Sequence, residues 1–190
     1  MAQRFGAAGL TNLNDWQRVM QESAGLPTAD KLRQINDFFN RRIRFEDDSV
    51  IWKTSDYWAT PLETLGKGAG DCEDFTIAKY LSLKNLGIPV AQMRLIYVKA
   101  KLGGPSSNIS QAHMVLAYYD APDAEPLVLD NLLGDIRVAG RRPDLTPVFS
   151  FNSEGLWLGA AGTDAAQTGG LNRLSRWQDL LQRARVEGID

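Results

Sequence analysis

The 190-residue sequence has very few of the side chains that metal and redox sites commonly use, because it contains one cysteine and one histidine. A single cysteine cannot form a disulfide within the chain or a cysteine-rich zinc site. A single histidine excludes the three-histidine catalytic zinc site and the two-histidine iron site. Any metal ion must therefore be held mainly by oxygen atoms, which favours calcium, magnesium or manganese.

The chain also lacks an excess of charge and a long apolar run. Its 21 lysines and arginines against 23 aspartates and glutamates give a formal net charge of −2. We therefore expect no general attraction to nucleic acid or to an anionic membrane surface. No segment approaches the roughly 20 apolar residues of a membrane span, and the first residues lack the apolar region of a secretory signal. The length predicts one compact domain over residues 1–190, either cytoplasmic or a mature domain without its leader.

The first half of the sequence has the patterns of helices. A short helix is expected after Asn14, a plausible N-cap, and a second one from Pro27. The mixed segment 44–57 is expected to be a loop with at most one strand. Residues 60–63, Thr-Pro-Leu-Glu, carry a capping box and a proline at the first helical position, so a short helix begins there and ends at Gly66.

A glycine-rich loop then leads into the run Asp-Cys-Glu-Asp at residues 71–74, followed by a wide apolar face that predicts a central, largely buried helix. From Val90 the apolar period changes to two, which predicts antiparallel strands before and after a loop at 102–110 and a returning strand at 127–130. A hairpin at 147–158 and a closing amphipathic helix around Trp177 complete the order, which is that of an α+β domain.

Cys72 has two interpretations. A lone cysteine is more often a small buried hydrophobe than a nucleophile. At the first turn of a helix, however, unpaired N–H groups and the helix dipole stabilise a thiolate. The same N–H groups could form an oxyanion hole for an attacked carbonyl.

His113 and Asp130 lie on strands joined by a short turn, so the hairpin register could set Asp130 beside His113 at one end of the sheet. A carboxylate in that place would hold the tautomer of the imidazole ring. The alternatives are a merely structural histidine and an aspartate that forms a turn.

Three acids flank the cysteine: Asp71, Glu73 and Asp74 place like charges near a thiol that must ionise, which raises its pKa. Acids at a helix start are usually only caps or compensation of the dipole. Together with loop carbonyls and water, three carboxylates could also supply the ~6–8 oxygen ligands that calcium prefers. The run does not match the 12-residue EF-hand loop.

Two longer motifs carry a resemblance. Residues 56–65 read DYWATPLETL and residues 68–74 read GAGDCED. With His113 and Asp130, they resemble the bacterial transglutaminase-like cysteine proteinases of the LapG type, over about residues 14–155. The resemblance implies a papain- or transglutaminase-like fold in which a central helix carrying the cysteine packs on an antiparallel sheet carrying the histidine and the aspartate.

The resemblance also implies roles for individual residues. By it, Cys72 is the nucleophile, His113 the general base and Asp130 the residue that orients it, and Trp58 borders the oxyanion site. Calcium becomes the favoured metal ion, with Asp71, Glu73 and Asp74 as its ligands. Asp56, whose segment runs directly ahead of Trp58, is expected as a fourth ligand.

Proteins of this type are periplasmic, calcium-dependent endopeptidases that cleave a large surface adhesin near its N-terminus at a di-alanine site, which releases it from the cell surface and disperses biofilm. An inner-membrane receptor that responds to cyclic di-GMP sequesters them. The resemblance thus implies a periplasmic protein that is not embedded in the membrane. Two alternatives remain at this point: a transglutaminase-like acyltransferase, and a calcium-stabilised binding module in which Cys72 is only buried.

Overall fold

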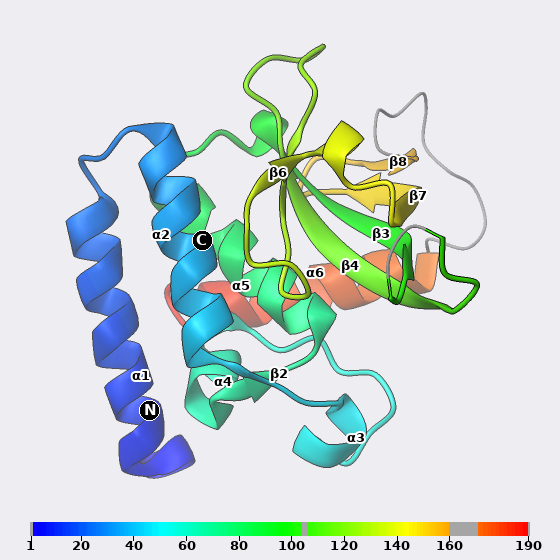
Figure 1. Ribbon diagram of the computed structural model, residues 1–190. Coiled ribbons are helices and arrows are strands. Elements are labelled where there is room, and N and C mark those ends of the chain that lie inside the picture. The colour runs from blue at the N-terminus through cyan, green and yellow to red at the C-terminus, as the bar shows by residue number, and fades with distance from the viewer. Residues whose placement is uncertain (1, 104–105, 160–170, 190) are drawn as a thin grey trace. The chain divides into compact units, whose positions relative to one another are not determined.

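The computed structural model describes residues 2–103, 106–159 and 171–189 (Figure 1). It combines helices with an antiparallel sheet, which confirms the predicted fold class. Its contacts group the chain into two compact units, Met1–Ile88 with Leu174–Asp190, and Pro89–Arg173. The single domain over residues 1–190 stays a prediction. Within the described ranges, no helix is both long and apolar enough to cross a membrane.

The first unit is mainly helical. A short parallel pair of strands, β1 and β2, joins the segment before α3 to the segment before α5. Its elements are α1 (Ala2–Ser23), α2 (Thr28–Arg42), β1 (Arg44–Phe45), α3 (Asp48–Ile51), α4 (Pro61–Lys67), β2 (Ala69–Gly70), α5 (Cys72–Asn85) and most of α6 (Leu171–Val186).

The first helix is longer than the sequence predicts, because α1 begins at Ala2 rather than near Asn14. The helix contains one non-helical residue, Gly6, and lies alongside α2 in Figure 1. Its early part packs on α4: a Cβ atom added to Gly66 would lie 2.4 Å from the ring of Phe5. This close approach stabilises a helical segment whose own apolar pattern is weak, and periodicity alone does not reveal it.

The capping box that the sequence predicts is present at the start of α4. The Glu63 amide donates to Thr60 Oγ1 at 3.3 Å, and the Thr60 amide donates to Glu63 Oε2 at 3.0 Å. The helix ends at Lys67, with Gly68 in the left-handed region at φ 62°. The next helix, α5, begins at Cys72 and is buried from Asp74 to Leu83, which confirms the predicted buried helix.

The second unit contains a six-stranded antiparallel sheet with the order β6-β5-β4-β3-β7-β8. The β3–β4 and β4–β5 pairs confirm the predicted hairpin order, and β7 with β8 confirms the hairpin expected near 147–158. The strands are β3 (Met93–Lys101), β4 (Ser110–Tyr118), β5 (Leu127–Leu129), β6 (Arg137–Val138), β7 (Leu145–Phe151) and β8 (Leu156–Leu158); the 3-10 turns η1 (Val90–Gln92) and η2 (Ala139–Arg141) precede β3 and follow β6.

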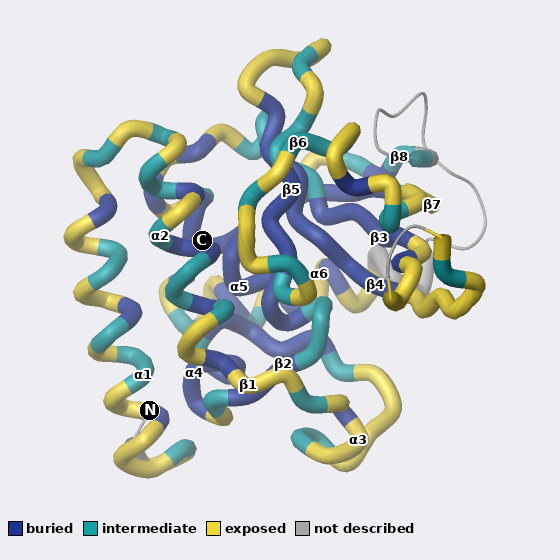
Figure 2. The backbone as a smooth tube through the Cα atoms, viewed as in Figure 1, coloured by how far each residue is buried: buried dark blue, intermediate teal, exposed yellow. Residues whose placement is uncertain are grey.

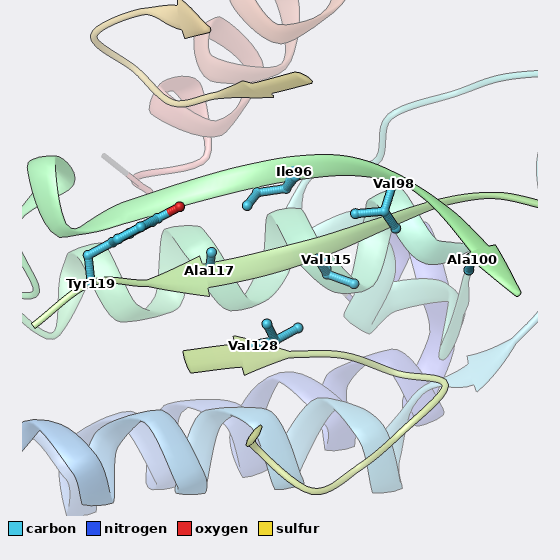
Figure 3. Close-up of a cluster of buried hydrophobic side chains, with 7 residues drawn as sticks. All are labelled: Ile96, Val98, Ala100, Val115, Ala117, Tyr119 and Val128. Carbon is cyan, nitrogen blue, oxygen red and sulfur yellow. The ribbon is translucent and has the colours of Figure 1, made fainter. Parts of the chain in front are cut away.

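One face of this sheet carries a buried apolar cluster, shown in Figure 3. Most of β3 and β4 is buried, as Figure 2 shows. His113 lies on the same face of β4 as Val115, since the two are separated by one residue. The sheet face therefore places the histidine beside an apolar core. The cluster consists of Ile96, Val98, Ala100, Val115, Ala117, Tyr119 and Val128.

Candidate active site and metal centre

The N-terminus of α5 is built around Asp71, which is the N-cap. Its Oδ1 atom accepts hydrogen bonds from the amides of Glu73 at 3.1 Å and Asp74 at 3.3 Å. Cys72 is the first residue of the helix and is partly buried. Its thiol donates to Glu73 Oε2 at 2.7 Å. The structure thus places the sulfur at the helix terminus, as the sequence predicts.

A cluster of three carboxylates lies in the same unit. One oxygen each from Asp48, Asp71 and Asp74 can be chosen so that all lie within 4.8 Å of one another. Calcium binds oxygen at 2.3–2.6 Å, so two oxygens on one ion are at most about 5 Å apart. The spacing therefore suits a single calcium ion.

Backbone groups hold the cluster in shape. Asp74 Oδ1 accepts from the amide of Ala59 at 2.8 Å, and Asp48 Oδ2 accepts from the amide of Tyr57. A Cβ atom at Gly70 would lie 2.7 Å from the Cβ of Asp74, so the approach of the two segments requires glycine. The β1–β2 pairing brings the segment that contains Asp48 to this helix terminus.

Within the described ranges, no lysine or arginine forms an ion pair with the three aspartates of the cluster. Burial, followed by the charges of Asp74, Glu73 and Asp48, raises the pKa of Asp71 to about 9. Burial also raises the pKa of Asp48, and that of Asp74 well above its usual range. Asp48 Oδ1 and Asp74 Oδ2 are buried and have no hydrogen-bond partner among the described residues. Two unpartnered carboxylate oxygens in a buried acidic group fit a bound cation.

The other two acids predicted as ligands have different surroundings. The carboxylate of Asp56 forms an ion pair with Arg176 on α6. Glu73 is not a member of the cluster within 4.8 Å, and its side chain contacts the thiol of Cys72. Asp48 is the residue that sequence reasoning missed. The only signal for it is a pair of acids, Asp47 and Asp48, in a segment expected to be a loop.

Trp58 is 2% exposed and lies edge-on to Trp177, with ring centroids 6.4 Å apart. Its carbonyl oxygen accepts a hydrogen bond from Arg183 Nη2 at 2.7 Å. Arg183 also pairs with the buried Glu63 at 2.7 Å. The segment that supplies the Ala59 amide to Asp74 is therefore fixed from α6 as well as from its own capping box.

The second unit brings His113 and Asp130 together. His113 Nε2 lies 2.7 Å from Asp130 Oδ1, and each residue is 1% exposed. Burial by itself would raise the pKa of Asp130, but the hydrogen bond and the charge of His113, the Leu132 amide and Arg142 together lower it to about 2. An ionised Asp130 accepts the proton on Nε2, which leaves Nδ1 as the basic nitrogen of the neutral ring.

Arg142 is a residue of this group that the sequence did not single out. It is 3% exposed, and its Nη2 donates to Asp130 Oδ2 at 2.7 Å. No local pattern marks it, because Arg141-Arg142-Pro143-Asp144 has the composition of an exposed turn.

The sequence profile of the bacterial transglutaminase-like cysteine proteinases matches residues 14–143. No curated protein matches the chain. Among solved structures, calcium-bound LapG from Legionella pneumophila aligns with a TM-score of 0.79 and 36% identity over 96% of this chain and 94% of that one. LapG of the same organism and its EGTA-treated form each align with a TM-score of 0.78 and 38% identity over 96% of this chain and 92% of theirs. This chain therefore belongs to the bacterial transglutaminase-like cysteine proteinases.

Proposed function

We propose that this protein is a calcium-dependent cysteine endopeptidase in which Cys72 is the nucleophile, His113 the general base and Asp130 the residue that orients it. The observation that carries the proposal is the buried His113–Asp130 pair at 2.7 Å. The chain belongs to a cysteine-proteinase family and contains one histidine and one cysteine. His113 and Cys72 are therefore the only residues of their types that can serve as base and nucleophile.

The chemistry follows from the tautomer of His113. With Nε2–H held by Asp130, Nδ1 takes the proton of the Cys72 thiol, and Asp130 stabilises the resulting imidazolium. The thiolate attacks the carbonyl carbon of the scissile peptide, and the backbone N–H of Cys72 at the start of α5 stabilises the oxyanion. The imidazolium protonates the leaving amine, and water then hydrolyses the thioester and regenerates the thiol.

Asp48, Asp71 and Asp74 are the proposed calcium ligands, with Glu73 close to them. A bound calcium ion would supply positive charge to these three carboxylates, two of which are buried, and would allow them to remain ionised beside the thiol. The calcium-bound and EGTA-treated forms of Legionella LapG support this choice of cation. Because Asp71 caps α5, an ordered cluster fixes the position of the residue that follows it, Cys72.

The substrate, location and regulation are proposed from the family resemblance. The substrate is a large surface adhesin, cut near its N-terminus at a di-alanine site, and its release from the cell disperses biofilm. The protein acts in the periplasm, where an inner-membrane receptor for cyclic di-GMP sequesters it. Trp58, held between α6 and the capping box, is proposed to border the oxyanion site.

The test incubates the wild-type chain and Cys72→Ala with an adhesin N-terminal fragment that contains a di-alanine site, in calcium and in excess EGTA. We expect cleavage only by the wild type and only in calcium, with circular dichroism showing both proteins folded in both buffers. Cleavage by Cys72→Ala, or full cleavage in EGTA, would contradict the proposal. An added primary amine provides the control for acyl transfer, because an amide product in place of the acid would indicate a transglutaminase-like reaction.

A further inference from the structure

Arg142 contacts the proposed catalytic aspartate on the oxygen that His113 does not use. Asp130 Oδ2 accepts from Arg142 Nη2 at 2.7 Å. Asp130 Oδ1 accepts from the Leu132 amide at 3.0 Å and lies 2.7 Å from His113 Nε2. Donors from three separate segments therefore define the position of both carboxylate oxygens.

The guanidinium is itself held in place by a second carboxylate. Arg142 Nε donates to Asp144 Oδ1 at 3.0 Å, and Nη2 donates to Asp144 Oδ2 at 2.8 Å. The backbone fixes the same turn, because the Asp144 carbonyl accepts from the Lys101 amide at the end of β3 at 2.8 Å. The Leu145 amide likewise donates to the Arg142 carbonyl at 3.0 Å. The arginine is thus tied to the sheet that carries His113.

These contacts link four side chains in a row, His113, Asp130, Arg142 and Asp144, in which the guanidinium lies between two carboxylates. A buried carboxylate that is held through only one of its oxygens can rotate or take up a proton, and either change would release the Nε2–H bond. A cationic donor on the other oxygen opposes both the rotation and the protonation of the carboxylate.

We infer that Arg142 is a positioning residue of the peptidase, which keeps Asp130 ionised and oriented so that His113 presents Nδ1 as its base. The inference rests on the proposed function, because it assigns Arg142 a role through Asp130 and His113. Asp144 holds the guanidinium of Arg142 through Nε and Nη2, and its own side chain is partly exposed.

The experiment compares Arg142→Met, which removes the donors at similar length, with Arg142→Lys, which keeps a positive charge, and with Asp144→Asn. Arg137→Gln is the matched control, because Arg137 is exposed and pairs with the exposed Asp135 at 3.2 Å in the same unit. For each variant in calcium, kcat and KM are measured on the adhesin fragment. The ring N–H proton of His113 is followed by NMR, which gives one signal because the chain has one histidine.

We expect Arg142→Met to lower kcat roughly 10–100-fold, as loss of an orienting outer partner does at other sites, with KM changed less than about twofold. The downfield N–H signal of the bond to Asp130 should broaden or disappear. Arg142→Lys should recover part of kcat and the signal. Asp144→Asn should lower kcat less than Arg142→Met does, and Arg137→Gln should match the wild type.

Wild-type kcat and an intact His113 signal in Arg142→Met would overturn the inference. If Arg142→Met does not fold, wild-type values in both Arg142→Lys and Asp144→Asn would overturn it equally. The NMR signal separates this result from failure of the proposed function, because it reports the His113–Asp130 bond even if the wild-type protein cleaves no peptide.

Discussion

Two groups of buried carboxylates in this protein have opposite electrostatic surroundings. In the second unit, Asp130 accepts hydrogen bonds from His113 and Arg142, and its pKa is lowered to about 2. In the first unit, Asp71 lies with Asp48 and Asp74, and burial and their charges raise its pKa to about 9. Among the residues that the structure describes, no lysine or arginine forms an ion pair with these three aspartates.

The difference shows two ways of keeping a carboxylate ionised inside a protein. Removing an ion from water costs several kcal/mol, and a nearby positive charge must offset that cost. For Asp130 the chain supplies the cation itself, so the pair does not depend on a bound metal ion. For the acidic cluster we propose that calcium supplies it, so the start of α5 depends on the ion concentration.

Replacing Asp130, which the chain's own cation keeps ionised, should have the largest effect on activity. In Asp130→Asn the side chain keeps one oxygen, which the cationic guanidinium of Arg142 takes, and the amide N–H₂ then faces His113. The ring is held in the wrong tautomer, and we expect kcat on the adhesin fragment to fall roughly 10³-fold with little change in KM.

The matched control is Asp135→Asn, which removes an exposed carboxylate that pairs with Arg137 in the same unit. An exposed pair contributes less than about 1 kcal/mol, so kcat and stability should stay near wild type. Equal activity of Asp130→Asn and Asp135→Asn would show that the buried pair has no part in the reaction.

Removing one ligand from the acidic cluster should have the next largest effect. At a calcium concentration about 100 times Kd, binding stabilises the folded state by about 2.7 kcal/mol. For a chain of this size that raises Tm by roughly 5–10 °C. Asp48→Asn should lose most of this increase, because it removes one of three charged ligands. Differential scanning calorimetry in calcium and in EGTA measures the shift.

Two variants sharpen this result. Asp47→Asn changes the neighbouring exposed carboxylate and should keep the full calcium shift. Asp56→Asn tests the fourth ligand that the sequence predicts, and since Asp56 pairs with Arg176 we expect the shift to remain. A wild-type shift in Asp48→Asn would place the ion elsewhere.

The parts of the two groups that local sequence could predict are those made by neighbours in the chain. The capping box at Thr60 and Glu63 and the start of a helix at Asp71 are encoded within a few residues. The proximity of His113 to Asp130 follows from the length of one hairpin, whose strands pair as expected.

The missed residues, Asp48 and Arg142, reach their groups by tertiary contacts. Asp48 depends on a two-residue parallel pairing, and strands this short leave no detectable periodicity. Arg142 depends on a turn after η2 and on a bond between Asp144 and Lys101. A charge that is buried only in the folded state looks in the sequence like any surface charge.

The pH dependence of stability in EGTA should reveal the uncompensated cluster. The folded pKa of Asp71 lies above its unfolded value, so the folded state keeps a proton that the unfolded chain releases. Without calcium, stability should therefore fall as the pH rises from about 4 towards 9. Urea unfolding at pH 5, 6.5 and 8 measures this slope.

Calcium should flatten the slope, because the bound ion favours the ionised carboxylates. Asp71→Asn in EGTA should make it shallower, since it removes one of the three aspartates whose pKa is raised. Stability that rises between pH 5 and 8 in EGTA would contradict the absence of a compensating charge.

Asp130 should show the opposite sign and the smallest effect. Its folded pKa of about 2 lies below the usual value of 3.8, so its contribution to stability is complete above pH ~4 and is lost as the pH falls towards 2. A shift of this size corresponds to about 2 kcal/mol. Urea unfolding of the wild type between pH 5 and 2.5 should show this loss of stability, and Asp135→Asn should show an equal loss. The stability of Asp130→Asn should depend less steeply on pH. An identical acid dependence in Asp130→Asn would mean that other carboxylates cause it, and that His113 and Arg142 do not hold Asp130 in its ionised form.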